Sequence, residues 1–271
     1  MNALVGEKLS IITHKAQTTR HRIMGIVNGD DFQIVYSDTP GILKPKYKLQ
    51  ETMMSSVNVA LSDADMFLYV TDVEEHMAFE GEYIDRIKES GIPVIIAMNK
   101  IDLTNQGDLE RIVESWHVAF PASPVIPVSA LNNFNLDALL KAILDKLPEG
   151  LPFFPKDQLT DKHERFFASE IIREKILFNY KKEIPYSVEI EIESFTEEKN
   201  LIRIRALIHV SRDSQKGIII GHKGAMLKKV GTEARHDMED FFRKKVFLEI
   251  YVKVTKNWRD KPLILKRFGY R

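Results

Sequence analysis

Four residues, Asn99-Lys100-Ile101-Asp102, follow an apolar run at 92–98 and have side chains suited to recognising one purine base. The carboxylate of Asp102 can accept hydrogen bonds from N1–H and the exocyclic amine of guanine, whereas adenine has no such donor pair. Asn99 would bind N7 of the base, and Lys100 would lay its methylene stem across the ring. The pattern therefore indicates guanine recognition. A capped turn at a strand end is the alternative for these four residues taken alone.

A second candidate site is Asp38-Thr39-Pro40-Gly41, which follows a strand-like stretch at 32–36. It matches the DxxG pattern of nucleotide hydrolases, in which Asp38 would hold Mg²⁺ through a water molecule. Gly41 would give its backbone N–H to a γ-phosphate, because a glycine lets the backbone come close to a ligand. Taken alone, Asp-Thr-Pro-Gly also fits an ordinary turn.

The elements that must position these motifs are predicted as alternating strands and helices. Short apolar strands at 32–36, 65–70, 92–98 and 125–128 are accompanied by helical patterns at 80–90 and 108–116. Such alternation predicts a mostly parallel sheet that binds ligands at the carboxyl ends of its strands. Ser129 and Ala130 follow the last strand, and backbone amides of this loop would contact O6 of guanine.

Composition limits the class of protein and divides the chain in two. The 271 residues are 44% hydrophobic and include no cysteine, which excludes disulfides and thiolate metal sites. No stretch of about 18 apolar residues predicts a spanning helix, and the amino terminus lacks the pattern of a signal peptide. Residues 1–150 contain 13 basic and 21 acidic side chains, whereas 151–271 contain 26 and 18. A basic half beside an acidic half suggests a nucleic-acid-binding domain joined to another domain.

The segment 147–155 concentrates prolines and a glycine, which predicts a linker. We assign 1–148 to the first domain, 149–164 to the linker and 165–271 to the second domain. In the second domain, alternating apolar residues predict strands at 188–193 and 202–210, joined by a turn at 196–200. A helix at 225–244 and a strand at 246–254 complete the order helix, hairpin, two helices, strand, which is the order of a type II KH domain.

Ahead of the predicted helix at 225–244, Gly221-His222-Lys223-Gly224 matches the GxxG loop that clamps a nucleic-acid backbone. Its two glycines allow close approach of the sugar-phosphate chain, and the helix N-terminus with Lys223 favours phosphate. A helix-turn-helix corner is the alternative. Further predicted RNA contacts are the lysines Lys216, Lys228 and Lys229, with Ile219 and Ile220 as candidates for contact with bases.

Four strings carry a family resemblance: Lys15-Ala16-Gln17-Thr18-Thr19-Arg20-His21-Arg22, Asp38-Thr39-Pro40-Gly41, Asn99-Lys100-Ile101-Asp102 and RFFASEIIREKI at 165–176. With them the whole chain resembles the Era family of bacterial GTPases, which join a G domain to an RNA-binding KH domain. The resemblance implies GTP and GDP as ligands and Mg²⁺ as cofactor. It also implies that Thr19 ligates the metal together with Asp38 and senses the γ-phosphate, with Thr18 the less favoured choice.

The resemblance further implies partners and a location. Members of the family bind the 3′ end of 16S ribosomal RNA during assembly of the small (30S) ribosomal subunit. We therefore expect a cytoplasmic protein, associated peripherally with the inner face of the cell membrane. We also expect a monomer.

Two departures from the family pattern concern the phosphates. The phosphate-binding loop G-x-x-x-x-G-K-[ST] occurs nowhere in the sequence, and residues 1–4 correspond to the helix just after that loop. We expect that the chain begins at an internal methionine of a longer protein; true loss of the nucleotide site is the alternative. Ile42 follows Gly41, where many GTPases carry a water-orienting glutamine, so the resemblance implies slow hydrolysis. Tight GTP binding is not expected of these 271 residues alone, and their GTPase activity stays open.

The expected fold is an α/β P-loop-type G domain that lacks its first strand, followed by an α+β type II KH domain. The expected function is a GTP-dependent switch that binds ribosomal RNA. The alternative is an RNA-binding KH protein with a degenerate G domain that binds no nucleotide. A small-molecule enzyme is a third hypothesis, but no catalytic set of residues supports it.

Overall fold

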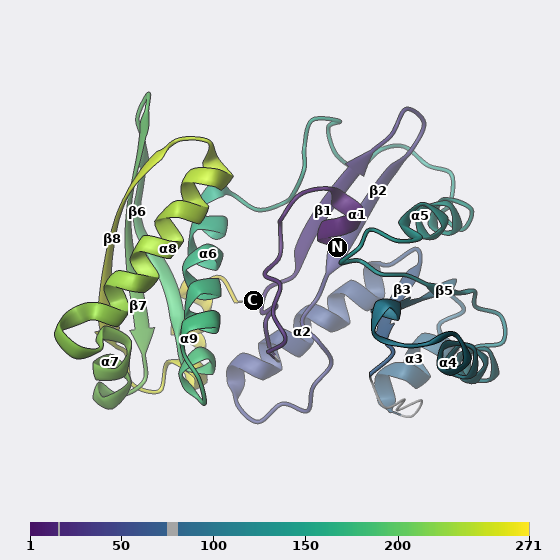
Figure 1. Cartoon of the computed structure of the whole chain (residues 1–271), viewed down its shortest axis with the longest axis horizontal. Helices are drawn as coiled ribbons and strands as arrows, with labels where there is room; N and C mark the ends of the chain where they lie inside the picture. Colours follow the sequence, from purple (N-terminus) through teal and green to yellow (C-terminus); the bar gives the residue numbers. More distant parts are fainter. Residues whose placement is uncertain (16, 75–80, 271) are drawn as a thin grey trace. The chain divides into compact units, whose positions relative to one another are not determined.

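The computed structural model describes residues 1–15, 17–74 and 81–270. It divides into two compact units, whose elements are labelled in Figure 1. The first unit contains 1–8, 25–36 and 58–159, and the second contains 9–24, 37–57 and 160–271. The segments 9–24 and 37–57, which the sequence places in the first domain, therefore belong by their contacts to the second unit.

A three-stranded parallel sheet in the order β3-β4-β5 forms the centre of the first unit. Its first two strands pair from Phe67 with Val94 to Asp72 with Asn99. β1 and β2 form a separate two-stranded sheet. The elements of this part of the chain are α1 (Asn2–Val5), β1 (Ile23–Asn28), β2 (Gln33–Asp38), α2 (Lys48–Asp63), β3 (Phe67–Asp72), α3 (Glu82–Glu89), β4 (Val94–Asn99), the 3₁₀ helix η1 (Ile101–Leu103), α4 (Gln106–Ala119), β5 (Val125–Pro127) and α5 (Leu136–Leu144).

The middle strand, β4, separates two hydrophobic cores. Ile95 and Ala97 pack with α5, whereas Ile96 and Met98 pack with α3 and α4. All four side chains are at most 2% exposed, as expected for a parallel strand covered on both faces. Because β4 ends at Asn99, the polar residues that follow lie at the carboxyl edge of the sheet.

A second sheet, in the order β6-β7-β8, organises the second unit. β6 pairs antiparallel with β7, and β7 pairs parallel with β8 over ten residues, from Leu201–Lys245 to Val210–Val254. α6 and α8 pack on the sheet face that carries the alternating apolar residues. The elements are α6 (Glu164–Asn179), η2 (Ile184–Tyr186), β6 (Glu189–Glu197), β7 (Leu201–Val210), α7 (Asp213–Ile220), η3 (His222–Gly224), α8 (Ala225–Phe242), β8 (Lys245–Val254), η4 (Trp258–Asp260) and α9 (Pro262–Arg267).

The predicted strands and helices are all found, with ends shifted by at most four residues. β1 and α2 were not predicted, and neither were α5 and α9. Ala16 and Glu80, which enter the sequence predictions, lie outside the described residues. No helix in the described ranges is both long and apolar enough to cross a bilayer.

Candidate nucleotide-binding and RNA-binding sites

The carboxyl edge of the parallel sheet brings together the two halves of the predicted guanine site. The side-chain oxygen of Asn99 accepts a hydrogen bond from the backbone N–H of Ala130, at 3.0 Å. The buried hydroxyl of Ser129 donates to Oδ1 of Asp102, at 2.5 Å. The segments 99–102 and 129–130 thus form one polar edge within the first unit.

The hydrogen bonds at this edge leave one carboxylate oxygen for a ligand. Oδ1 of Asp102 is bound by Ser129, whereas its Oδ2 has no hydrogen-bond partner among the described residues. Asp102 is exposed, so a base can reach it. The N–H of Ala130 donates to Asn99, so its predicted contact with guanine O6 would have to share that proton.

Lys100 is fixed beside the same edge by two carboxylates. Its backbone is left-handed, with φ of 59°, and its Nζ lies 2.6 Å from Oδ2 of Asp72 and 3.4 Å from Oε2 of Glu74. The hydrogen bond to Asp72 is the main cause that raises the pKa of Lys100. These contacts hold the ammonium at the carboxyl end of β3; the predicted position of the stem over a base stays a prediction.

Asp38 ends β2, where the sequence predicts a metal-binding carboxylate. Its Oδ2 accepts a hydrogen bond from the hydroxyl of Ser10, at 2.5 Å. Thr39 and Gly41 follow in an irregular loop, and a Cβ added at Gly41 would meet no atom within 4 Å. The described residues therefore leave room for a side chain at Gly41, and its predicted contact with a γ-phosphate stays a prediction.

The carboxylate and hydroxyl oxygens near Asp38 suit a Mg²⁺ ion that is held mainly by a bound nucleotide. Carboxylate and hydroxyl oxygens suit this ion, which takes one or two protein carboxylates and completes its shell with water and phosphate. Over 1–15, 17–74 and 81–270, no group of three or more His, Cys, Asp or Glu side chains could hold a metal by itself. Asp38 and Thr19 would therefore need phosphate oxygens to complete the coordination.

Thr19 lies in a segment that is held by the second unit, which the sequence did not predict. Nζ of Lys15 donates to the carbonyls of Leu177 and Tyr180, at the C-terminal end of α6. Arg173 of α6 donates to the carbonyl of Thr18, at 2.5 Å. We call residues 15 and 17–21 the strap, because these bonds fasten it along α6.

Arg20 is the deepest anchor of the strap. Its side chain is 1% exposed, and its guanidinium donates to the carbonyls of Val188 and Pro185 and to Glu189. Tyr270 donates its hydroxyl to the same carboxylate, at 2.7 Å. Burial raises the pKa of Glu189, while Arg20 and Tyr270 oppose that shift. Removing Arg20 would leave a buried carboxylate without its cation.

His21 stacks within the same network. Its ring lies 4.2 Å from the Tyr270 ring and edge-on to Phe166, with ring centroids 5.6 Å apart. Enclosure by these rings lowers the pKa of His21 to about 4, with Glu170 opposing the shift and Arg173 adding to it. His21 is therefore neutral in the folded protein near pH 7.

The predicted GxxG loop joins α7 to α8 and contains two backbone conformations that only glycine adopts readily. Gly221 has φ of 70° and Gly224 has φ of 79°. His222 and Lys223 between them are exposed, and α8 begins directly after Gly224. The loop therefore presents backbone, a lysine and a helix N-terminus to solvent, as a phosphate clamp requires.

One predicted RNA contact is wrong. Ile219 is fully buried in the core of the second unit, and its carbonyl accepts the hydroxyl of Tyr180. Ile220 is half-buried and stays a candidate, and the neighbouring Ile218 is 49% exposed. The period of α7 turns Ile219 inward, which a run of three isoleucines does not reveal.

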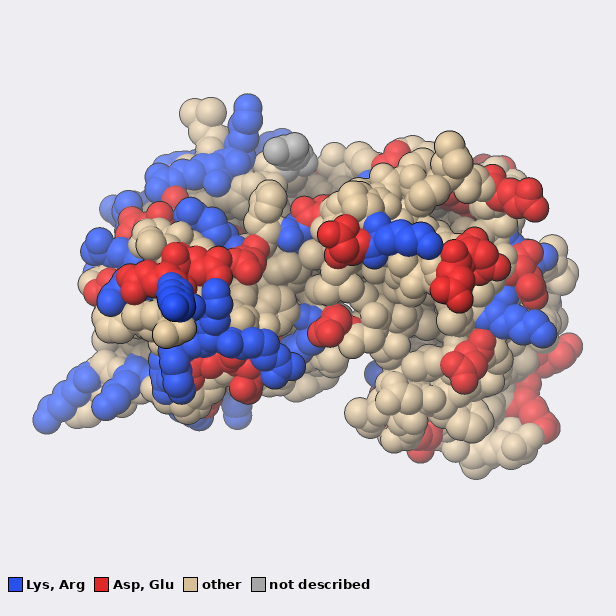
Figure 2. Space-filling model, turned by 90° about the horizontal axis from the view of Figure 1, so that it is seen from above, with Lys and Arg blue, Asp and Glu red and all other residues tan. Residues whose placement is uncertain are grey.

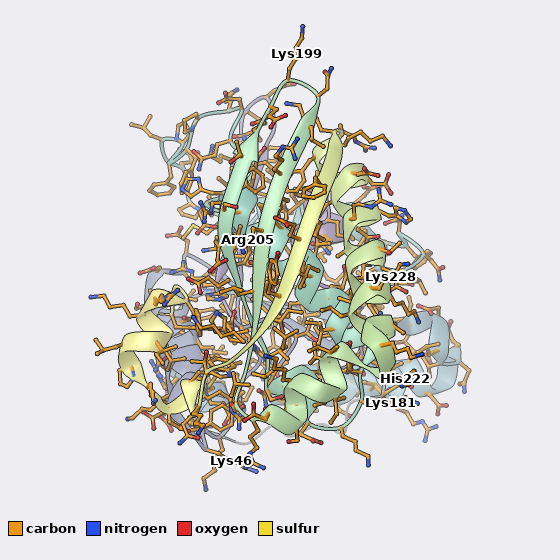
Figure 3. All side chains as sticks on the ribbon, turned by 90° about the vertical axis from the view of Figure 1, so that its left-hand side faces the viewer. Lys46, Lys181, Lys199, Arg205, His222 and Lys228 are labelled. Carbon is orange, nitrogen blue, oxygen red and sulfur yellow. The ribbon has the colours of Figure 1, made fainter. Side chains whose placement is uncertain are left out.

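Basic side chains surround the GxxG loop. Lys216 is half-buried on α7, and Lys228 and Lys229 are exposed on α8. Figure 3 shows His222, Lys181 and Lys228 on the same side of the second unit. In Figure 2 lysine and arginine are prominent over this unit, whereas acidic residues are scattered over the first. The charge division predicted from the sequence is thus visible on the surface.

Comparisons with known proteins agree with this architecture. Residues 1–100 match a family described as 50S ribosome-binding GTPase, and residues 183–259 match the KH domain. The chain is 45% identical to a protein named GTPase Era from Syntrophus aciditrophicus (strain SB), over 100% of this chain and 89% of that protein.

Two solved structures are similar over nearly the whole chain. One is Era in complex with MgGDPNP and nucleotides 1506–1542 of 16S ribosomal RNA, with 37% identity, a TM-score of 0.93, and coverage of 99% of this chain and 92% of that chain. The other is a variant of Aquifex aeolicus Era bound to GDP and AlF4⁻, with the same identity and TM-score and coverage of 99% and 93%. The predicted fold class, a G domain with a parallel sheet followed by a KH domain, is confirmed. The chain belongs to the Era family of GTPases.

Proposed function

We propose that this protein recognises the guanine base of a nucleotide through its first unit and binds ribosomal RNA through its second unit, which we call the KH unit. We also propose that it acts in assembly of the small ribosomal subunit. The observation that carries the nucleotide part is the bonded pair of segments at the sheet edge, Asn99 with Ala130 and Ser129 with Asp102. This arrangement leaves Oδ2 of Asp102 without a hydrogen-bond partner in the described ranges. This oxygen can therefore accept from a ligand that has two donors.

Asp38 and Thr19 are the proposed Mg²⁺ ligands, Thr39 and Gly41 lie at the γ-phosphate, and Lys100 lies along the base. A Mg²⁺ ion held by Asp38 and Thr19 would supply positive charge that neutralises the charge of the phosphates. Ile42 is exposed and has no polar group to orient water, so any hydrolysis would depend on backbone, metal and partner.

The RNA part is supported by the GxxG loop and the lysines around it. The positive φ angles of Gly221 and Gly224 let the chain turn, and neither glycine has a side chain that would cover its backbone. His222, Lys223, Lys216, Lys228 and Ile220 are the proposed contacts. The Era relative described above is bound to a segment of 16S ribosomal RNA, and we propose the 3′ end of that RNA as the ligand here.

The proposed domain bounds rest on the proline- and glycine-containing segment 147–155, and two further proposals rest on the family resemblance. The domain bounds are 1–148, 149–164 and 165–271. The 30S subunit is the particle on which the protein acts. The protein is cytoplasmic, with peripheral association to the membrane.

The test compares the 271-residue chain with the same chain fused at its amino terminus to the phosphate-binding loop of an Era relative. Binding of a fluorescent GTP analogue and of a fluorescent RNA from the 3′ end of 16S ribosomal RNA is measured by anisotropy, with and without Mg²⁺. We expect both chains to bind the RNA and the fused chain to bind GTP in preference to ATP. RNA binding without guanine binding in either chain would favour the nucleotide-free alternative. Absence of RNA binding would refute the proposal that the KH unit binds RNA.

A further inference from the structure

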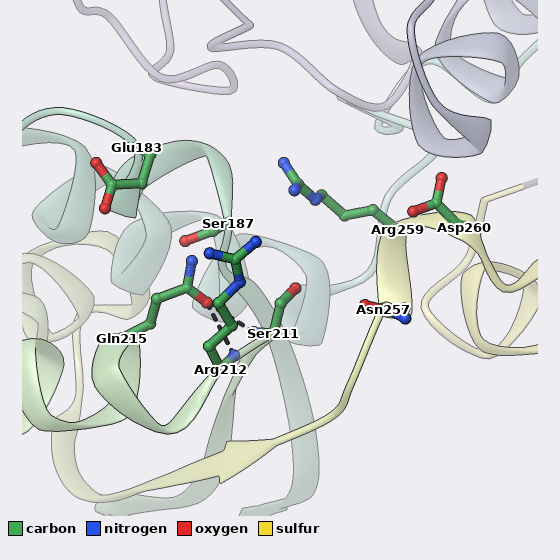
Figure 4. Close-up of a pocket in the computed structure, with 8 residues that line it drawn as sticks. All are labelled: Glu183, Ser187, Ser211, Arg212, Gln215, Asn257, Arg259 and Asp260. Carbon is green, nitrogen blue, oxygen red and sulfur yellow. Dashed lines mark hydrogen bonds between the residues drawn. The ribbon is translucent and has the colours of Figure 1, made fainter.

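A pocket of about 260 Å³ opens in the KH unit, at the other end of α7 from the GxxG loop. It lies between the end of η2, the start of α7 and η4, and its lining residues are drawn in Figure 4. None of the four residues of the GxxG loop lines this pocket.

Two arginines define the chemistry of the pocket. The guanidinium groups of Arg212 and Arg259 point into the space between the elements, whereas the carboxylates of Glu183 and Asp260 lie toward its margins (Figure 4). In the described part of the chain, neither arginine forms an ion pair with a carboxylate. Two converging cations that these carboxylates do not pair suit an oxyanion, which guanidinium binds through paired donors.

The arginine from η4 is held in place by an aromatic ring. The guanidinium of Arg259 lies 4.7 Å from the centre of the Tyr47 ring. Such stacking orients the planar group and leaves its N–H edges free for hydrogen bonds. Arg259 is half-buried, so this side chain is placed before any ligand arrives.

The first turn of α7 supplies a third feature of the pocket that favours an anion. The side-chain oxygen of Gln215 accepts from the backbone N–H groups of Ser211 and Arg212, at 3.0 Å each, which fixes the turn into the helix. The positive end of the α7 dipole faces the pocket and favours an anion. The Ser211 hydroxyl oxygen is buried and finds no partner within the described ranges. A ligand with acceptor oxygens would supply one.

We propose that this pocket binds a phosphodiester of the same RNA strand that the GxxG loop clamps. The proposal rests on the RNA binding proposed above. Eight helical residues separate the two positions, which at 1.5 Å per residue places them about 12 Å apart along α7. A single strand that runs along the helix would meet the GxxG loop at one end and the two arginines at the other. The pocket therefore lengthens the RNA footprint beyond the nucleotides that a KH loop clamps.

The test uses the full chain and two single-stranded RNAs, one of about four nucleotides, the length that a KH loop clamps, and one of about twelve. Arg212→Gln with Arg259→Gln removes both guanidiniums. Lys199→Gln with Lys245→Gln removes two exposed charges elsewhere on the unit and serves as the control. Because Arg212 is exposed and Arg259 half-buried, we expect both variants to fold, and circular dichroism melting checks this.

We expect the arginine variant to bind the long RNA about tenfold more weakly, while binding of the short RNA stays unchanged. The slope of log K against log salt for the long RNA should fall by about 0.7, the value for one phosphate contact to a single strand. Unchanged binding of the long RNA, or equal loss for both RNAs, would overturn the proposal. Tight binding of inorganic phosphate by calorimetry, together with unchanged RNA affinity, would assign the pocket to free phosphate instead. Failure of the unmodified chain to bind either RNA would refute the proposed function itself.

Discussion

At the scale of single residues, Asp102 decides which base the sheet edge accepts. Its Oδ1 already accepts a hydrogen bond from the Ser129 hydroxyl, so the donors of a ligand are recognised mainly by Oδ2. In Asp102→Asn the amide oxygen can keep the Ser129 bond, and the NH₂ group then points at the ligand as a donor. Xanthine has an oxygen where guanine has an amine, so it fits the altered site.

We expect Asp102→Asn to weaken GTP binding by at least about tenfold and to improve binding of xanthosine triphosphate, because a donor that faces a donor leaves both unpaired. The measurement is competition binding in the chain fused to a phosphate-binding loop. Asp108→Asn, the same change at a half-buried position on α4, is the matched control. Unaltered base preference in Asp102→Asn would rule out its contact with guanine.

The GxxG loop offers a second single-residue prediction, and the structure shows which glycine to change. A Cβ at Gly221 would lie 2.8 Å from the Met226 side chain, so a substitution there would also disturb α8. A Cβ at Gly224 meets no atom within 4 Å, and aspartate tolerates a left-handed backbone better than most residues.

We therefore expect Gly224→Asp to abolish RNA binding, measured by anisotropy, through repulsion of phosphate while the unit stays folded. Gly224→Asn, which adds the same bulk without charge, separates repulsion from loss of space and should retain more affinity. RNA affinity equal to that of the unmodified chain in Gly224→Asp would contradict the clamp.

At the scale of elements, the strap makes stability depend on pH. The folded pKa of His21 is about 4, below its ordinary value of 6.5, so protonation is favoured in the unfolded chain. The resulting stabilisation is complete above pH 6.5 and is lost as the pH falls toward 4. It amounts to about 3 kcal/mol, because the pKa falls from 6.5 to about 4 and one pKa unit corresponds to 1.36 kcal/mol.

We expect His21→Phe, which keeps a stacking ring but cannot titrate, to flatten the decline in unfolding free energy between pH 6.5 and 4. Urea unfolding at a series of pH values measures it, with His117→Gln on the exposed face of α4 as control. A slope equal to that of the unmodified chain would show that His21 is not enclosed in solution.

Sequence patterns predicted the elements that have a strong period or a strong motif, and little of what holds them together. The alternation in β6 and β7 and the apolar run of β4 are local signals, so they could be read directly. The contacts of Arg20 with Val188 and Glu189 join residues more than 160 positions apart, and a basic stretch such as Arg20-His21-Arg22 normally indicates a solvated loop. Burial of Ile219 and exposure of Ile218 depend on how α7 docks, which three identical residues do not encode.

At the scale of the whole molecule, the order of segments along the chain differs from their grouping into compact units. The strap is distant in sequence from the KH elements, yet its contacts belong to their unit. A KH domain cut at the predicted boundary would leave Glu189 buried without Arg20, a loss of about 3–5 kcal/mol for a broken buried pair.

We expect a fragment of residues 160–271 to be stabilised by a synthetic peptide of residues 9–24, by about 2.7 kcal/mol when the peptide is at one hundred times its dissociation constant. Thermal melting measures the effect. A peptide with Arg20→Gln and His21→Ser should give no shift. Equal shifts from both peptides would mean that these two side chains do not anchor the strap.

The parallel pairing of β7 with β8 also fixes the order in which the KH unit can be completed. The hairpin β6-β7 forms from neighbouring residues, but β7 cannot pair on its other side until α7, the GxxG loop and α8 have been made. During synthesis, one edge of β7 therefore exposes unpaired backbone groups, which invite association with other chains. Closing this long-range contact is expected to be the slow step of folding. A chain interrupted before Lys245 would carry the whole GxxG sequence and still lack the third strand of the sheet behind it.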